Sequence, residues 1–142
     1  MGYLDSLNIT GSALTAERFR TDIIMQNLAN QNTTRTAEGG PYKRKQVVFR
    51  ENTLNFKTEL GKAMTKAENG GVFVEEVVES QNPSVPVYDP DHADEDGYVM
   101  MPNVNSAEEM VDLMAASRAY EANVTALNVA KSMALKALEI GK

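Results

Sequence analysis

Apolar residues recur at helical spacing at both ends of the chain and at strand spacing only between those ends. The first helical pattern runs from residue 4 to residue 30. Four of its positions repeat every seventh residue, which is typical of a coiled-coil seam with polar interruptions. These positions are Leu7, Leu14, Thr21 and Leu28. The pattern therefore predicts a long helix with one face for a partner helix.

Asn and Thr residues crowd positions 26–34, where this first helical pattern stops. Their side chains compete with the helical backbone for hydrogen bonds, so the simpler interpretation is a helix end. The alternative is an amide cluster that bonds to neighbouring subunits and includes Asn30, Asn32 and Thr33. Chemistry alone favours the helix end, because termination needs no partner.

The second helical pattern runs from residue 106 to residue 140 and opens with a start signal. Ser106 and Glu109 have the spacing of a capping box, in which each side chain bonds the other residue's free backbone N–H. Heptad positions follow, and no proline interrupts them, so a continuous rod of roughly 50 Å is expected. The heptad positions are Met110, Leu113, Ser117, Tyr120, Val124, Leu127, Lys131, Ala134 and Leu138.

The last third of this helix has a second apolar stripe. It consists of Ala126, Ala130, Met133, Ala137 and Ile140. A helix that is apolar on two faces is normally buried on both, and this chain has little material left to cover the second face. We therefore expect another copy or a relative to cover it. We also expect the ends of the free monomer to be partly disordered and to fold on assembly.

The segment between the helices reads as strands and turns, and it holds all five prolines. Residues 43–50 and 72–79 have the composition of strands and are predicted to pair as a hairpin. Residues 51–69 are expected to be variable and to contain a short amphipathic helix between residues 56 and 67. Pro83, Pro86 and Pro90 are expected to keep residues 82–90 extended and outside any helix.

Together these elements predict an α+β fold. Its long N- and C-terminal helices would pair as an antiparallel, coiled-coil-like domain, with a small β-hairpin in the middle segment. The expected divisions are residues 1–35 and 104–142 for the helical core and residues 36–103 for the β-containing segment. Residues 51–70 are expected to form a variable insertion within that segment.

Charge narrows the range of partners. The net charge of −6 argues against a nucleic-acid binder, which usually carries a basic face. Residues 1–50 hold seven Lys and Arg against four Asp and Glu, and the remainder holds seven against sixteen. This asymmetry favours head-to-tail association between copies, although solvated faces produce it as often.

The sequence offers neither cysteine chemistry nor a recognisable signal for export. The chain contains no cysteine, so it has neither disulfides nor thiolate metal sites. No stretch reaches the roughly 18–20 apolar residues that a membrane span needs. Residues 1–30 carry charges where a cleavable signal would have its apolar core. If the protein leaves the cytoplasm, we expect it to do so without a cleaved signal peptide.

The densest charge run, residues 89–96, raises the question of a metal site. It contains five acids and the only histidine, but the spacing fails that of a calcium-binding EF-hand loop. One histidine with scattered acids also falls short of a zinc site. A solvated turn before the C-terminal helix is the better interpretation. A metal-dependent enzyme that uses Asp89, Asp91 or His92 is a remote alternative.

No catalytic motif is present. The sequence has no nucleophile elbow, no phosphate-binding loop and no paired histidines. We therefore expect neither an enzyme nor a cofactor, nor a small-molecule substrate.

Several segments resemble the bacterial flagellar rod and hook proteins. Residues 11–16 and 27–33 are similar to the N-terminal motif of that family. Residues 40–49 are similar to the strand that follows this motif in the proximal rod members, and residues 97–104 are also similar to those members. The most specific likeness covers residues 109–124 and continues through residues 127–133. The resemblance spans nearly the whole chain in the right order, and only residues 51–70 depart freely.

The resemblance implies a structural subunit of the basal-body rod, outside the cytoplasmic membrane and exported by the flagellar type III apparatus. It implies terminal helices in the inner tube of a hollow drive shaft and an outward-facing middle segment. The implied neighbours are further copies, other rod proteins and the adaptor at the export-gate side. It also favours an interface role for residues 30–33, with Tyr120 and Asn123 as packing and bonding groups opposite them.

The candidate subunit-interface residues are drawn from both helices. They are Leu14, Leu28, Asn30, Asn32, Thr33, Met110, Leu113, Tyr120, Asn123, Leu127, Met133 and Leu138. The alternative from another class is a soluble, homo-oligomeric coiled-coil adaptor that binds a partner helix.

Overall fold

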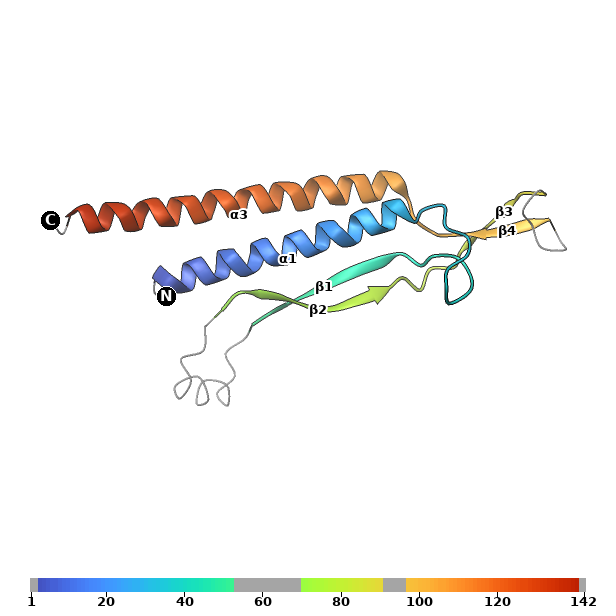
Figure 1. Ribbon diagram of the computed structural model, residues 1–142, viewed down its shortest axis with the longest axis horizontal. Helices are drawn as coiled ribbons and strands as arrows, with labels where there is room; N and C mark the ends of the chain where they lie inside the picture. Colours follow the sequence, from blue (N-terminus) through green and yellow to red (C-terminus); the bar gives the residue numbers. More distant parts are fainter. Residues whose placement is uncertain (1–2, 53–69, 91–96, 141–142) are drawn as a thin grey trace, which may run out of the picture.

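The computed structural model of the chain describes residues 3–52, 70–90 and 97–140. Two long helices dominate it: α1 (Tyr3–Ala29) and α3 (Ser106–Ile140). They lie side by side and run in opposite directions (Figure 1). The predicted α+β fold with paired terminal helices is confirmed, and the predicted bounds of the second helix agree with those of α3. Neither helix, within the described residues, is long and apolar enough to cross a bilayer.

The helix α1 forms the middle layer of the molecule. It packs against α3 on one side and against a hairpin of β1 (Lys45–Glu51) and β2 (Val72–Glu79) on the other (Figure 1). In the described residues, the backbone of α3 does not come close to that of either strand. Because α1 is covered on two sides, its sequence must satisfy two different partners.

The hairpin matches the predicted pairing of residues 43–50 with 72–79. The strands are antiparallel, with Val47 opposite Val77 and Phe49 opposite Val74. The register shifts between Val48 and Phe49, which marks a β-bulge. The extra residue lets Val74 and Val77 face the same side although they are three positions apart, since unbulged strands alternate faces with period two.

A second hairpin was not predicted. The strands β3 (Val85–Tyr88) and β4 (Tyr98–Met101) pair antiparallel, and Tyr88 and Tyr98 meet edge to face with ring centroids 5.6 Å apart. Residues 85–88 are extended and lie outside any helix, as expected from the prolines, but they are also paired. Pro86 is tolerated because every strand of a two-stranded ribbon is an edge strand. The hairpin packs on no other described element.

The start of α3 is capped differently from the prediction. The side-chain oxygen of Asn105, rather than that of Ser106, caps the helix: Asn105 Oδ1 accepts from the backbone N–H of Ala107 at 3.0 Å. Ser106 donates its hydroxyl proton to the Gln31 side chain instead. The predicted capping box is therefore wrong, because both of its side chains bond to residues outside the helix.

The heptad assignment in α3 is only partly right for the contact with α1. Met110, Ser117 and Lys131 are exposed, whereas Glu109 and Ala116 are buried. The less exposed positions still repeat every seventh residue, at Glu109, Ala116, Asn123 and Ala130, so this part of the contact face lies one residue earlier than predicted.

Two of the sequence predictions fall outside the described residues. They are the amphipathic helix within residues 51–69 and most of the acidic run, residues 91–96. Where side chains are described, no group of three or more His, Asp or Glu could hold a metal ion.

Candidate assembly site

Two polar side chains of the described residues are fully buried, and one of them is Asn27 at the end of α1. Its Nδ2 donates to the Lys45 carbonyl at 2.8 Å and to Glu109 Oε2 at 3.0 Å. Its Oδ1 accepts from the Tyr42 hydroxyl and from the Lys45 N–H, both at 2.9 Å. An amide has two donor protons and two acceptor lone pairs, so this one is fully satisfied. We call these residues, with Arg44, the Asn27 junction.

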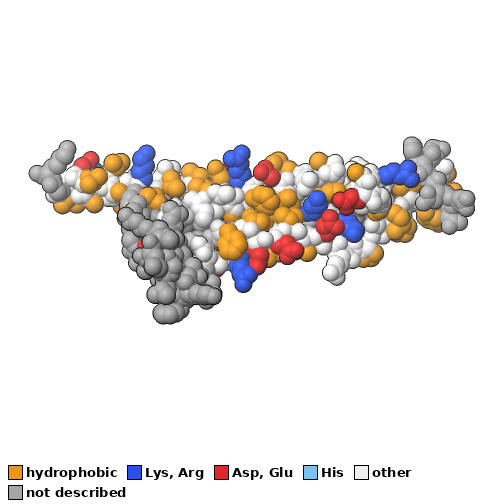
Figure 2. All heavy atoms as spheres, turned by 60° about the horizontal axis from the view of Figure 1, so that its bottom comes forward, with side chains coloured by type: hydrophobic (Ala, Val, Ile, Leu, Met, Phe, Trp, Pro, Cys, Tyr) orange, Lys and Arg blue, Asp and Glu red, His pale blue; other side chains and the backbone are white. Residues whose placement is uncertain are grey.

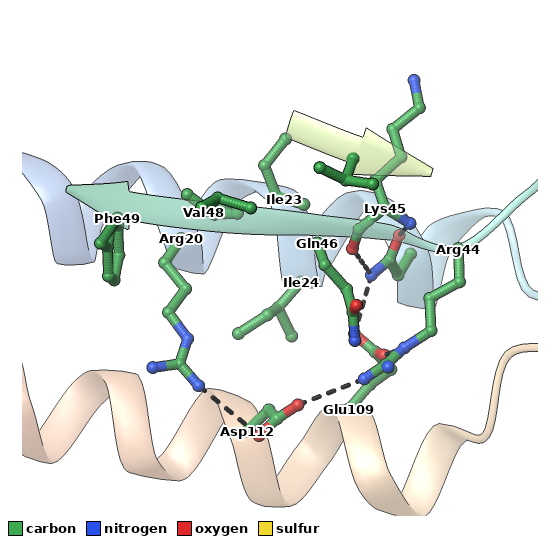
Figure 3. A pocket seen from close by; sticks show the side chains of 13 residues that line it. Arg20, Ile23, Ile24, Arg44, Lys45, Gln46, Val48, Phe49, Glu109 and Asp112 are labelled. Carbon is green, nitrogen blue, oxygen red and sulfur yellow. Dashed lines mark hydrogen bonds and ion pairs between the residues drawn. The ribbon is translucent and has the colours of Figure 1, made fainter. Parts of the chain in front are cut away.

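Glu109, the second of these buried side chains, brings α3 into the Asn27 junction. Its carboxylate pairs with the Nε of Arg44, which lies just before β1. Arg44 also donates to Asp112 at 3.3 Å, and Arg20 of α1 lies 3.6 Å from that carboxylate (Figure 3). A buried carboxylate is tolerated only when it is paired and hydrogen-bonded, as here.

Tyr42 completes the Asn27 junction on the hairpin side. Burial, and to a smaller extent the carboxylates of Glu109 and Glu79, raise the pKa of its hydroxyl above the usual value of 10.0. The hydroxyl therefore stays protonated near neutral pH and keeps its hydrogen bond to Asn27.

A groove of about 440 Å³ opens beside the Asn27 junction, between α1, β1 and α3. Figure 3 shows apolar side chains, among them Ile24 and Phe49, and the paired charges of Arg20 and Asp112 around it. The two arginines and the two acids around it, Arg20, Arg44, Glu109 and Asp112, bind one another, and the Lys45 ammonium lies 5.8 Å from the centre of the Tyr42 ring. The arrangement suits the fixing of three elements to one another better than it suits a reaction.

The far end of the β1–β2 hairpin is also fixed to α1. The Ser12 hydroxyl accepts from the Val72 N–H at 3.1 Å and donates to the Ile9 carbonyl at 2.8 Å. Gly71, just before β2, has φ of 105°, and a Cβ there would lie 2.4 Å from Ser12 Oγ. Only glycine combines this backbone conformation with such a close approach.

Replacing Gly71 with alanine should therefore lower the free energy of unfolding by about 2–3 kcal/mol, through backbone strain and a clash with Ser12. The matched control is Gly39→Ala, at φ of 85° with nothing within 4 Å of the added Cβ. This control should lower the free energy of unfolding by only about 1 kcal/mol, from backbone strain alone. Urea unfolding measures both, and equal losses would contradict the close approach.

Exposed apolar side chains dominate the last turns of α3, residues 129–140, which we call the α3 tail. This end of α3 extends beyond the start of α1 (Figure 1), and apolar side chains remain visible there in Figure 2. Leu138 is 71% exposed and Ile140 is 86% exposed. The other large apolar residues exposed in the α3 tail are Val129, Met133 and Leu135. This surface is suited to a partner.

The predicted interface residues are distributed over two environments. Half-buried within the chain are Leu14, Leu28, Asn30, Thr33, Leu113, Asn123 and Leu127. Exposed are Asn32, Met110, Tyr120, Met133 and Leu138. The half-buried leucines serve the fold of the single chain, and the exposed residues are available to another subunit. Whether any of them contacts a subunit stays a prediction.

Residues 30–33 form the turn that follows α1. Asn30 Nδ2 donates to the Gln26 carbonyl at 2.9 Å, and the Thr33 N–H donates to the Asn30 carbonyl at 3.0 Å. Within one chain, Tyr120 and Asn123 do not lie opposite this turn. Tyr120 is about 14 residues, or roughly 20 Å, beyond the start of α3, where the turn packs. Asn123 donates locally to Ala119.

The sequence prediction missed Asn27, Arg44 and Glu109 as a group. The sequence pattern places Asn27 in an Asn-rich helix end and Glu109 in a capping box. Asn27 and Glu109 are 82 residues apart in the chain, so no local spacing joins them. The available signal was an acid in the contact face of α3, which calls for a partner when buried.

Comparisons with known proteins agree on one family. Residues 95–140 match the model described as flagellar basal body rod FlgEFG protein C-terminal. The chain is 46% identical over 145 residues to the flagellar basal-body rod protein FlgC of Bacillus subtilis (strain 168), covering 96% of this chain and 97% of that relative. It is 46% identical over 144 residues to FlgC of Escherichia coli O6:H1, with 100% of both chains covered. FlgC of Borreliella burgdorferi is 42% identical over 149 residues, with 99% and 98% covered.

Proposed function

This chain belongs to the FlgC family of flagellar basal-body rod proteins and is a structural component of that rod; from this premise we propose how it is built into the rod. Its terminal segments, residues 1–35 and 104–142, pack as the inner helical part of the proximal rod. Residues 36–103 face outward. The subunit reaches this position through the flagellar type III apparatus, without a cleaved signal peptide.

The observation that carries this proposal is the α3 tail. Its Leu135, Leu138 and Ile140 are 53%, 71% and 86% exposed, and the C-terminal end of α3 extends beyond the start of α1 (Figure 1). Large apolar side chains clustered on several faces of one helix mark a surface that associates. In the rod, neighbouring subunits cover it.

The partners that fit this surface are helices of the same kind. Further copies of this chain, other rod proteins and the adaptor at the export-gate side supply them. The α3 tail contributes Met133 and Leu138, and the outer face near the start of α3 contributes Met110, which is 56% exposed. Asn32 and Tyr120 add polar contacts between subunits.

Torque then passes through packed side chains. Close-packed interiors yield little, so interlocked helices resist sliding against one another. Within each subunit, the Asn27 junction and the Ser12 contact connect the outer hairpin to the inner helices. A force on the outer hairpin is thereby transmitted to the inner helices.

Replacing Leu138 with aspartate should abolish recovery of the protein in detergent-washed basal bodies, because a charge would be placed in the contact between subunits. Leu138 is 71% exposed in the single chain, so the helical content by circular dichroism should not change. Glu139→Asp is the control, since it places an aspartate at the neighbouring position without changing the charge.

Two outcomes would contradict the proposal. Unsubstituted protein that stays in the soluble fraction would favour a soluble coiled-coil adaptor instead. Normal recovery of the Leu138→Asp variant in basal bodies would show that the α3 tail is not the contact surface.

A further inference from the structure

We infer that Asn27 is a positioning residue that makes the docking of the β1–β2 hairpin and the docking of α3 depend on each other. The inference concerns the single chain and does not rest on how that chain is assembled into the rod.

The Asn27 amide extends the edge of the hairpin. It bonds both the N–H and the carbonyl of Lys45, at 2.9 and 2.8 Å. Two neighbouring antiparallel strands exchange the same pair of bonds between residues directly opposite each other. On its other side, Lys45 pairs with Glu79 of β2. The side chain of α1 thus takes the place of a further strand at this one position.

The same amide nitrogen bonds Glu109 of α3 at 3.0 Å. Both Asn27 and Glu109 are buried, with 1% and 0% of their surfaces exposed. If α3 separates from α1, Asn27 loses an acceptor and Arg44 loses its buried partner. If the hairpin separates from α1, Glu109 loses the ion pair with Arg44, and Asn27 loses both bonds to Lys45. In either case, buried polar groups lose partners, which disfavours partial separation.

This pair of side chains is the direct route for the coupling. In the described part of the chain, the backbone of α3 lies close to that of α1 but not to that of either strand of the hairpin. The side chains that join α3 to the hairpin segment are those of Asn27 and Arg44. A change at Glu109 can therefore reach the hairpin amides through these two residues.

The distribution of buried residues indicates that the Asn27 junction is an ordered region. Ile24 and Tyr42 are buried in or near the Asn27 junction, whereas large apolar residues of the α3 tail are exposed. Stability differs along a structure, and regions with few buried contacts open first. In the free chain the Asn27 junction remains ordered while the ends of the helices fray.

Hydrogen exchange measured by mass spectrometry on the full chain tests the inference. Asn27→Asp keeps an oxygen that accepts from the Tyr42 hydroxyl and the Lys45 N–H but removes both donor protons. It also places the new carboxylate opposite that of Glu109. Exchange should rise about tenfold or more both in residues 45–51 and in residues 106–116. The control is Asn30→Asp, because the Asn30 amide nitrogen donates to the Gln26 carbonyl within its own helix. It should leave both segments unchanged.

Adding Glu109→Gln to Asn27→Asp separates coupling from a local structural role. The glutamine introduced at position 109 can donate to the aspartate introduced at position 27 and still accept from Arg44. The bond between the two positions is then restored with reversed polarity. Protection should return towards the original level in the hairpin as well as in α3. If Asn27→Asp unfolds the whole chain, recovery of the folded state by Glu109→Gln is the expected result.

Three results would overturn the inference. The first is exchange that rises in only one of the two segments on Asn27→Asp. The second is a Glu109→Gln addition that changes α3 but leaves the hairpin amides as they were, or that fails to recover an unfolded variant. The third is a Lys45 amide that exchanges at the unfolded rate in the unsubstituted chain.

Discussion

Replacing Leu127 with aspartate is expected to prevent incorporation into the rod and to abolish swimming, while the protein is still expressed. Leu127 is half-buried on the face of α3 that packs against α1. Its loss removes roughly half of the apolar burial of a fully buried leucine, which is worth about 1.5–3 kcal/mol, and the new carboxylate must be desolvated or force the helices apart. Because few of the described residues are buried between the helices, this substitution should prevent α1 and α3 from packing.

The measurement is a swarm assay in soft agar together with immunoblots of purified basal bodies. Asn128→Asp is the matched control, because it adds the same charge at the next, exposed position of α3. It is expected to keep motility. A Leu127→Asp strain that swims normally would show that this face does not hold α3 in place.

Replacing Arg44 with methionine should lower the free energy of unfolding by about 3–5 kcal/mol, because it leaves the buried carboxylate of Glu109 without its cation. Methionine preserves most of the apolar length of the side chain, so the loss reports mainly the charge. Adding Glu109→Gln should recover most of the stability, since a neutral amide needs no counter-charge there. Urea unfolding followed by circular dichroism measures all three chains.

Arg50→Met provides the comparison for that experiment. Arg50 pairs with Glu75 on the exposed side of the hairpin, where 63% of its side chain is accessible. Exposed pairs contribute about 0–1 kcal/mol, so this variant should unfold nearly as the original does. Equal losses for Arg44→Met and Arg50→Met would mean that Glu109 does not need a buried partner.

The helices and the first hairpin were predictable because each is encoded locally. The bounds of α3 followed from an uninterrupted apolar period, and β2 followed from a run of β-branched residues between glycines and polar turns. The second hairpin was not predictable in the same way. Its strands have four residues each, one contains Pro86, and most of their side chains are exposed, so neither alternation nor a continuous apolar run marks them.

The candidate site was harder to predict, because the interface residues are predicted mainly from their apolar character. This criterion identifies side chains such as Leu138, whose exposure agrees with a surface for a partner. It overlooked the Asn27 junction, since polar residues usually lie at the surface and only the tertiary structure shows these to be buried. Glu109 illustrates the difficulty: the same spacing that predicts a capping box also fits a carboxylate directed at a different element.

The distance in sequence between Asn27 and Glu109 also bears on when the chain can fold. Closing a loop of 82 residues costs entropy that no local contact repays beforehand, and long-range contacts slow folding. The helix α1 lies between two partners, and one of them, α3, is the last element of the order observed. In the export that we propose, a chain that passes lengthwise from its first residue cannot complete this helix pair until α3 has emerged, so α1 lacks that partner during transit.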